Sequence, residues 1–365
     1  MKSFLFSLLV LATCIPTSVL AAEPSFADSV MRARVLSVES AGERAVAGTD
    51  LSEAFQRLSV EVIEGAQKGE ILEVENNAPT ALSVGDVFYL HKVSDEFGTQ
   101  YAVGEPDRRW VLFGLAGLFV LVTVVAAGKA GALSLLSLVL SFLIIIYGLV
   151  PALSSGGDPV LISVFFAIVM LAVAMIMTHG LNRAMWVALA GSIVALVFAA
   201  VVAHIAVALA NLSGFASDET VFLNFATDGA INLPALLLGG ILVGIVGILN
   251  DVSVSQVHTV IEISDANPAL TKKEVLTRAM RVGQEHMGAV VNTLPLAYAG
   301  ASLPLLLLFF GSDASPLFIL NREIFAVELI RTFAGGIGLM CSGVIATLLA
   351  VMFTGPARHR DRIAI

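Results

Sequence analysis

The sequence predicts a polytopic α-helical membrane protein, with about seven transmembrane helices and a small β-barrel-like domain before them. Composition is the first reason: 57% of the 365 residues are hydrophobic and 13% are charged, whereas soluble domains are about a quarter charged. The second reason is that more than half of the Asp and Glu residues lie between residues 23 and 107. The third is the change there from short alternating segments to long apolar ones. One part of the chain is therefore suited to water and the other to lipid, which predicts two domains.

Residues 1–22 are typical of a secretory signal peptide. Lys2 provides the positive flank, residues 4–12 the apolar core, and residues 19–22 a small-residue cleavage region. An uncleaved anchor is the alternative, and both versions place residue 23 outside the cytoplasm. After cleavage Cys341 is the remaining cysteine, so neither a disulfide framework nor a thiolate metal site is expected.

Residues 23–107 form the predicted extracytoplasmic domain. Period-two alternation and intervening turn residues predict strands near Met31–Val38, Arg57–Ile63, Ile71–Glu75, Asp86–Val93 and Thr99–Val103. Five short strands favour a small closed or nearly closed barrel, OB-like or SH3-like. The segment lacks a basic, aromatic-rich face, so nucleic acid is not an expected partner. It could serve as a spacer or dock another envelope protein.

Residues 108–355 form the predicted membrane domain. The apolar segments long enough to cross a bilayer are 110–128, 132–150, 160–178, 184–210, 233–253, 288–310 and 324–353. With the β domain outside, the inner loops of the membrane domain carry most of its Lys and Arg residues, including Lys129, Arg183 and Lys272, and the outer loops hold only Arg322, plus Arg108 and Arg109 at the first span. This asymmetry predicts an outer N-terminus and a basic cytoplasmic tail at residues 356–365.

A polar stripe follows the fifth span in NDVSVSQVHTVIEI, residues 250–263. At 100° per residue, Asp251, Ser255, His258 and Glu262 fall within about 60° of one another on a helix. The same face continues backward through small residues that favour close helix packing, namely Gly240, Gly244 and Gly247. We expect this face to point toward protein or water. The alternative is that the helix extends into the cytoplasm and its polar side is solvated there, with Glu262 about 16 Å beyond Asp251.

The sixth and seventh spans carry further polar groups. Asn292 and Thr293 precede Pro295, which cannot donate to the carbonyl of residue 291 and so leaves that oxygen free for a cation, a substrate or a structural partner. In the seventh span, Glu328 and Arg331 can pair at i, i+3. Gly335 and Gly338 continue that side as a second packing track.

The sequence does not favour a metal site, a cofactor or an enzyme. His258 and Glu262 have a compatible but undiagnostic spacing, and HExxH, Gly-x-Ser-x-Gly, P-loop and dinucleotide motifs are absent from the sequence. His179 and His204 are isolated and are expected to be packed or interfacial. An intramembrane hydrolase would need Ser255 with His258, which lack an orienting third group.

The chain resembles the YibE/F-like family of bacterial multispanning membrane proteins. The matching stretches are GILNDVSVSQVHTVIEI, GQEHMGAVVNTLPLAYAGASLPLLLL and NREIFAVELIRTFAGGIGL. The resemblance covers residues 31–354 and maps the family pattern onto Asp251, Ser255, Glu262, Asn292, Thr293, Glu328 and Arg331. His258 and His286 fall outside that pattern. The resemblance implies a multi-pass protein of the bacterial cytoplasmic membrane and implies no activity.

Two functions remain open at this point. The leading hypothesis is a transporter-like or channel-like protein whose last three spans enclose Asp251, Ser255, Glu262 and Asn292, because a carboxyl group in a low-dielectric site can exchange a proton or bind a cation. The alternative is a non-transporting assembly factor or scaffold that docks a partner through the β domain. Membrane lipid is an expected partner of both, and a homo-oligomer is compatible with both.

Overall fold

The computed structural model describes residues 29–353 except 46–51, 66, 78–79, 96–97 and 311–314. The described chain divides into two compact units, one ending at Val125 and the other beginning at Ala126. The expected signal segment, 1–22, and the expected basic tail, 356–365, lie outside the described residues.

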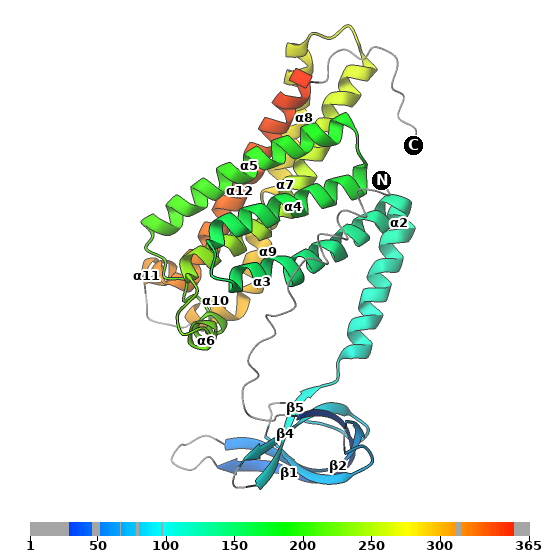
Figure 1. Ribbon diagram of the computed structural model, residues 1–365, viewed down its shortest axis with the longest axis vertical. Helices are drawn as coiled ribbons and strands as arrows, with labels where there is room; N and C mark the ends of the chain where they lie inside the picture. Colours follow the sequence, from blue (N-terminus) through cyan, green and yellow to red (C-terminus); the bar gives the residue numbers. More distant parts are fainter. Residues whose placement is uncertain are drawn as a thin grey trace. The chain divides into compact units, whose positions relative to one another are not determined.

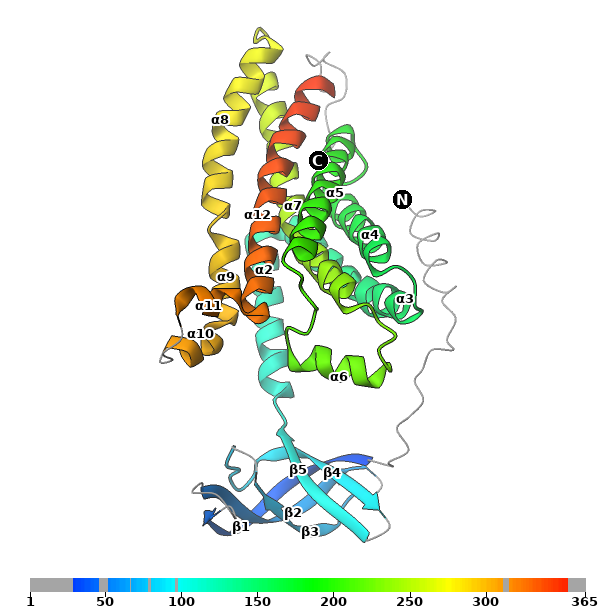
Figure 2. The same cartoon turned by 90° about the vertical axis from the view of Figure 1, so that its left-hand side faces the viewer.

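The first unit contains a nearly closed antiparallel barrel (Figure 2). Its strands are β1 (Ser29–Ala45), β2 (Ser52–Glu64), β3 (Ile71–Asn76), β4 (Val87–Asp95) and β5 (Gly98–Pro106). The sheet order is β3-β2-β1-β4-β5, and contact between β3 and β5 nearly closes the sheet. All five predicted strands are present. Each extends beyond its predicted bounds except at the start of β3, which is Ile71 as predicted, and at the start of β4, which is one residue later.

The barrel core follows the alternation in the sequence. Successive side chains of a strand point to opposite faces, and the inward positions Ala33, Val35, Val60 and Phe88 are buried. Outward positions on the same strands are polar, such as Arg34 opposite Glu61 in the β1–β2 register. The alternation that predicted the strands therefore also selects the core.

An ion-pair cluster closes the end of the barrel where β5 finishes. The Asp107 side chain is 3% exposed and accepts hydrogen bonds from Arg32 at 2.7 Å and from Arg109 Nε at 3.0 Å. Arg32 also binds Glu64 at 2.9 Å. The hydrogen bond from Arg109, followed by charge attraction to both guanidinium groups, lowers the pKa of Asp107 to about 2. The cluster links β1, β2 and the residues that follow β5.

The rest of the described chain is almost entirely helical. Its elements are α2 (Arg109–Ile144), the π-helix η1 (Ile145–Leu149), α3 (Val150–Ser154), α4 (Pro159–His179), α5 (Arg183–Leu209), α6 (Asp218–Ala226), α7 (Leu233–Ala266), α8 (Lys272–Val290), α9 (Thr293–Ala301), α10 (Leu303–Phe310), α11 (Pro316–Asn321) and α12 (Glu323–Phe353).

Side-chain caps set the start of three long helices. Asp158 accepts from the Val160 amide at 2.8 Å, directly before Pro159 at the first position of α4. Asn182 and Asn232 cap α5 and α7 in the same way. Thr271 and Glu274 form a capping box that opens the 19-residue helix α8.

Five helices are long and apolar enough to cross a membrane, or six if the bent segment 272–310 counts as one. The spans predicted at 110–128 and 132–150 fall in one 46-residue stretch, Arg109–Ser154. Gly128 interrupts its helical geometry with φ 55° and ψ −134°. The sixth predicted span is broken twice, at residues 291–292 and again at Ser302, where the chain bends by 66°. Pro295 and Pro304 lie shortly after these breaks. Proline has no backbone N–H, so neither residue can donate the hydrogen bond that would continue the helix across the break.

In the second unit α7 packs against α4, α5, α8 and α12 (Figure 1). Glycine lets these helices approach closely: a Cβ on Gly338 of α12 would lie 2.8 Å from Ala199 of α5, and one on Gly335 would lie 2.9 Å from Ile245 of α7. Figures 1 and 2 show α6, α10 and α11 at one end of this bundle and the α7–α8 turn at the other.

Candidate functional site

One face of α7 is a buried polar surface that holds the bundle together. Ser253 is fully buried, and its hydroxyl lies 2.6 Å from that of Ser342 on α12. Ser342 and Ser192 of α5 each donate to the Leu249 carbonyl at 3.2 Å. These hydrogen bonds join three helices where water is excluded, which is the usual role of small polar residues between membrane helices.

Gln256 extends this buried face toward α8. Its side-chain carbonyl accepts from the Thr347 hydroxyl of α12 at 3.0 Å. Its amide group rests against Gly283 of α8, where an added Cβ would lie 2.5 Å from the Gln256 carbonyl oxygen. Sequence reasoning did not single out Ser253 or Gln256, because Asp251 and His258 are the more polar residues of the same segment.

The predicted stripe lies on a different face of α7, which is largely exposed in the described structure. Gly240, Gly244, Gly247, Asp251, His258 and Glu262 are exposed, and Ser255 is half-buried. No atom lies within 4 Å of the Cβ position of Gly240 or Gly247. The helix contact predicted for this glycine track is therefore not made at Gly240 or Gly247 within the described chain, and Gly244 contacts only Tyr298 of α9 there. Gly239, about 100° around the helix, makes the close approach to α4 through Ser163. We call this exposed side of α7, from Gly240 to Glu262, the open face.

Four ionisable side chains from three helices gather at the C-terminal part of the open face. Asp251 accepts a hydrogen bond from Asn250 at 3.1 Å. It lies within electrostatic range of His179 on α4 and His286 on α8. The His258 ring is 5.8 Å from the His179 ring. We call Asp251, His179, His258 and His286 the Asp–His cluster.

His179 is the member that sequence reasoning missed, because it appeared isolated. Its ring nitrogen Nδ1 lies 2.6 Å from the Thr178 hydroxyl, and its carbonyl accepts from Asn182, the cap of α5. A signal was nevertheless available: the third and fifth spans run in the same predicted direction, so His179 and Asp251 both fall at the inner ends of their spans.

A second group borders the open face deeper in the bundle. Arg331 Nη1 donates to both Glu328 oxygens, at 2.8 and 3.1 Å. The guanidinium carbon lies 5.6 Å from the centre of the Tyr298 ring of α9. The Tyr298 hydroxyl lies 3.4 Å from the Cβ position of Gly244. Gly244 is two helical turns, or about 10 Å, from Asp251 along α7.

Other predicted site residues lie apart from these two groups. Asn292 and Thr293 are exposed at the break between α8 and α9, and neither side chain makes a hydrogen bond among the described residues. Ser255 and His258, the pair required by the hydrolase alternative, are not hydrogen-bonded to each other there either. Glu262 lies three turns beyond Asp251, toward the end of α7.

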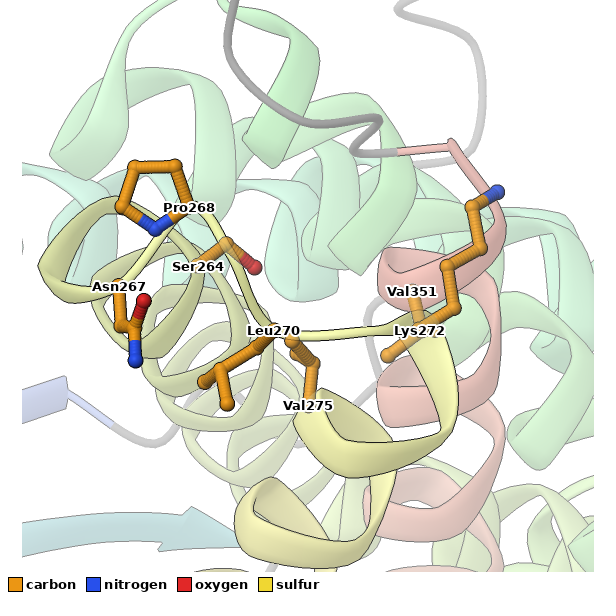
Figure 3. A pocket seen from close by; sticks show the side chains of 7 residues that line it. All are labelled: Ser264, Asn267, Pro268, Leu270, Lys272, Val275 and Val351. Carbon is orange, nitrogen blue, oxygen red and sulfur yellow. The ribbon is translucent and has the colours of Figure 1, made fainter.

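Two cavities lie at opposite ends of the bundle and outside the open face. The first, of about 170 Å³, is at the α7–α8 turn and is lined by Ser264, Asn267, Pro268, Leu270, Lys272, Val275 and Val351 (Figure 3). Its one charged group, Lys272, extends along the end of α12 and donates to the Met352 carbonyl at 3.3 Å. The second, of about 250 Å³, is mainly apolar and includes His204 and Asn232.

The Asp–His cluster combines one carboxyl group with three imidazole groups, which are the side-chain types that most often carry protons in enzymes. Within the described residues, no three His, Cys, Asp or Glu side chains are placed to hold one metal ion.

Residues 115–355 match the family model described as YibE/F-like protein. The curated proteins and the solved structures give no match to the chain.

Proposed function

The chain belongs to the YibE/F-like family, and from that premise we propose that it is a multi-pass transport protein of the bacterial cytoplasmic membrane. In this proposal the open face of α7 lines a water-filled path through the membrane. Protons bind at Asp251 and exchange with the surrounding histidines as they pass. The Glu328–Arg331 pair lines the same path at greater depth.

The observation that supports transport is the continuity of the open face. Gly244 lies about 16 Å along α7 from Leu233, close to the middle of an apolar layer about 30 Å thick. An Arg, a Glu and a Tyr border an uncovered glycine surface at that depth. Ionisable groups in a membrane face protein or water, and here a second chain or a water-filled passage would have to cover them.

We also propose seven crossings. The stretch Arg109–Ser154 has 46 residues, about 69 Å at helical rise, so it is twice as long as one crossing requires. A turn at Gly128, followed by Lys129, would divide it into two. Counting 272–310 as one broken span then gives an outer β domain and an inner C-terminus, in agreement with the Lys and Arg distribution. The strand order, with β1 between β2 and β4, favours an OB-like barrel.

Proton flux in vesicles tests the proposal. Purified full-length protein is reconstituted, a pH gradient is imposed, and internal pH is followed with a dye. We expect Asp251→Asn to reduce flux to the leak of empty vesicles, because the amide cannot take up a proton. Asp265→Asn is the matched control, since Asp265 is exposed on the same helix beyond the cluster, and it should retain flux.

Flux in Asp251→Asn equal to that of the wild-type protein would contradict the proposal. The outer β domain as a docking module would then be the remaining candidate. Crosslinking of an envelope protein through residues 30–104 is the observation that would support it.

A further inference from the structure

We propose that Arg331 binds the carboxylate or phosphate group of an anionic ligand through its Nε–Nη2 edge. This inference rests on the proposed function, because it assigns a substrate class to the same open face. The transported species would then be an organic or inorganic oxyanion that moves with a proton. The Glu328–Arg331 pair, interpreted from sequence as a structural ion pair, becomes part of the binding site.

Among the described residues, the Nε–Nη2 edge of the Arg331 guanidinium has no hydrogen-bond partner. Both bonds to Glu328 come from Nη1. Nε is buried and has no hydrogen-bond partner in the described structure. The remaining Nε–Nη2 edge is a planar pair of donors, which matches the two oxygens of a carboxylate or phosphate. An unpaired buried N–H of a charged group is costly, so the geometry points to an acceptor.

The surroundings of Arg331 suit an oxyanion. Arg331 lies eight residues after the start of α12, about 12 Å along the helix. Its side chain is 26% exposed, and a charge-assisted hydrogen bond at such a partly buried position is strong. The Tyr298 ring lies beside the guanidinium, and its hydroxyl reaches the open face at Gly244. Glu328 holds the guanidinium in one orientation and leaves the pair without net charge. An arriving anion therefore adds one negative charge, which a proton taken up at the Asp–His cluster would balance.

Replacement of Arg331 by Lys separates this role from a purely structural one. A lysine keeps the positive charge and can still pair with Glu328, so a structural lock would survive. It cannot present two parallel donors to an oxyanion. Glu328→Gln acts in the opposite direction, because it removes the negative charge beside the proposed site while keeping a hydrogen-bond acceptor for Arg331.

The test is calorimetric titration of the purified full-length protein in a neutral detergent, with acetate and inorganic phosphate as probes. We expect one of the two to bind saturably to the wild-type protein. Arg331→Lys should weaken that binding at least tenfold without lowering the thermal unfolding temperature. Glu328→Gln should strengthen it severalfold. Asp265→Asn should bind normally, because Asp265 is exposed and lies outside both groups. The titration measures anion binding without proton flux, so loss of anion binding and loss of proton flux are distinguishable.

Two results would overturn the inference: equal binding by Arg331→Lys and the wild-type protein, or no saturable binding of either probe to the wild-type protein. A second arm identifies the natural source of the oxyanion. Nanodiscs of phosphatidylcholine are compared with nanodiscs containing phosphatidylglycerol. Competition by phosphatidylglycerol that depends on Arg331 would support the site and assign it to a lipid headgroup, whereas unchanged probe binding would support a soluble anion.

Discussion

The Ser253 hydroxyl on α7 lies 2.6 Å from the Ser342 hydroxyl on α12, and both side chains are fully buried. Asp251 is two residues from Ser253, about 200° around the helix, and it is exposed. The two sides of α7 therefore have different tasks. The serine side joins helices, and the Asp251 side is left available for solvent or ligand.

The serine contact predicts a measurable loss of stability on Ser342→Ala. The change removes the bond to Ser253 and the bond to the Leu249 carbonyl. Interhelical hydrogen bonds in membranes contribute about 0.6–1.7 kcal/mol, so we expect the free energy of unfolding to fall by about 1 kcal/mol, measured by denaturant titration in detergent. Ser264→Ala is the control, because among the described residues the Ser264 hydroxyl bonds only the Val260 carbonyl of its own helix. Equal losses in the two variants would contradict the interhelical role.

The glycines of the bundle should divide into two classes. A Cβ on Gly338 would lie 2.8 Å from Ala199, whereas none of the surrounding atoms lies within 4 Å of the Cβ position of Gly247. We expect Gly338→Ala to destabilise the protein by about 1–3 kcal/mol through overpacking. Gly247→Ala should be neutral or stabilising by up to about 1 kcal/mol, because alanine favours the helix. The same unfolding measurement compares both. A destabilising Gly247→Ala would mean that another surface covers the open face.

Hydropathy and alternation predicted the elements better than they predicted the contacts. The span expected at 160–178 is α4, Pro159–His179, and that at 184–210 is α5, Arg183–Leu209. These bounds could be predicted from the sequence because capping residues and a continuous apolar run are local features. The apolar run of α7 stops near residue 253, but the helix continues to Ala266. This agrees with the polar stripe, which was expected on one helix through Glu262, and Val257 and Val260 of this part pack into the core.

The orientation of α7 could not be derived from its own residues. Both sides of the helix after Leu249 carry polar groups. The charged side therefore has the same sequence pattern whether it faces protein or solvent. Which side of α7 is buried depends on residues far away in sequence. Ser342 hydrogen-bonds Ser253, and Gly283 packs against Gln256. His179 joined the site for the same reason, since its approach to His258 depends on how α4 packs on α7.

A bulky residue on the open face should block transport without unfolding the protein. Gly247 lies one turn from Asp251 and has free space at its Cβ position. We therefore expect Gly247→Leu to keep the wild-type unfolding temperature and to reduce proton flux in vesicles at least tenfold. Gly288→Leu is the control, because Gly288 is an exposed glycine of α8 with no atom within 4 Å of its Cβ position. Undiminished flux in Gly247→Leu would place the path elsewhere.

The Asp107 cluster predicts acid sensitivity of the barrel. The Asp107 pKa is lowered from 3.8 to about 2 by Arg109 and Arg32. A carboxyl group whose pKa falls on folding stabilises the folded state above its unfolded pKa, and this contribution is lost as pH falls through the folded value. The stabilisation, at most about 2 kcal/mol, should be complete above about pH 5 and decline toward pH 2. Amide hydrogen exchange of β1 and β4 in the full-length protein, corrected for intrinsic rates, measures it.

Asp107→Asn isolates that contribution, because it removes the charge that faces Arg32 and Arg109 while keeping the side-chain volume. The variant should exchange faster than the wild-type protein at pH 7 and should lose less protection between pH 5 and pH 2, since there is no carboxylate left to protonate. Glu105→Gln is the control: the Glu105 side chain is 76% exposed and pairs with Arg108, and exposed pairs contribute little. An Asp107→Asn variant with the wild-type pH profile would show that other carboxylates govern the acid response, and the cluster would then be a positional link between β1 and the end of β5 with no net effect on stability.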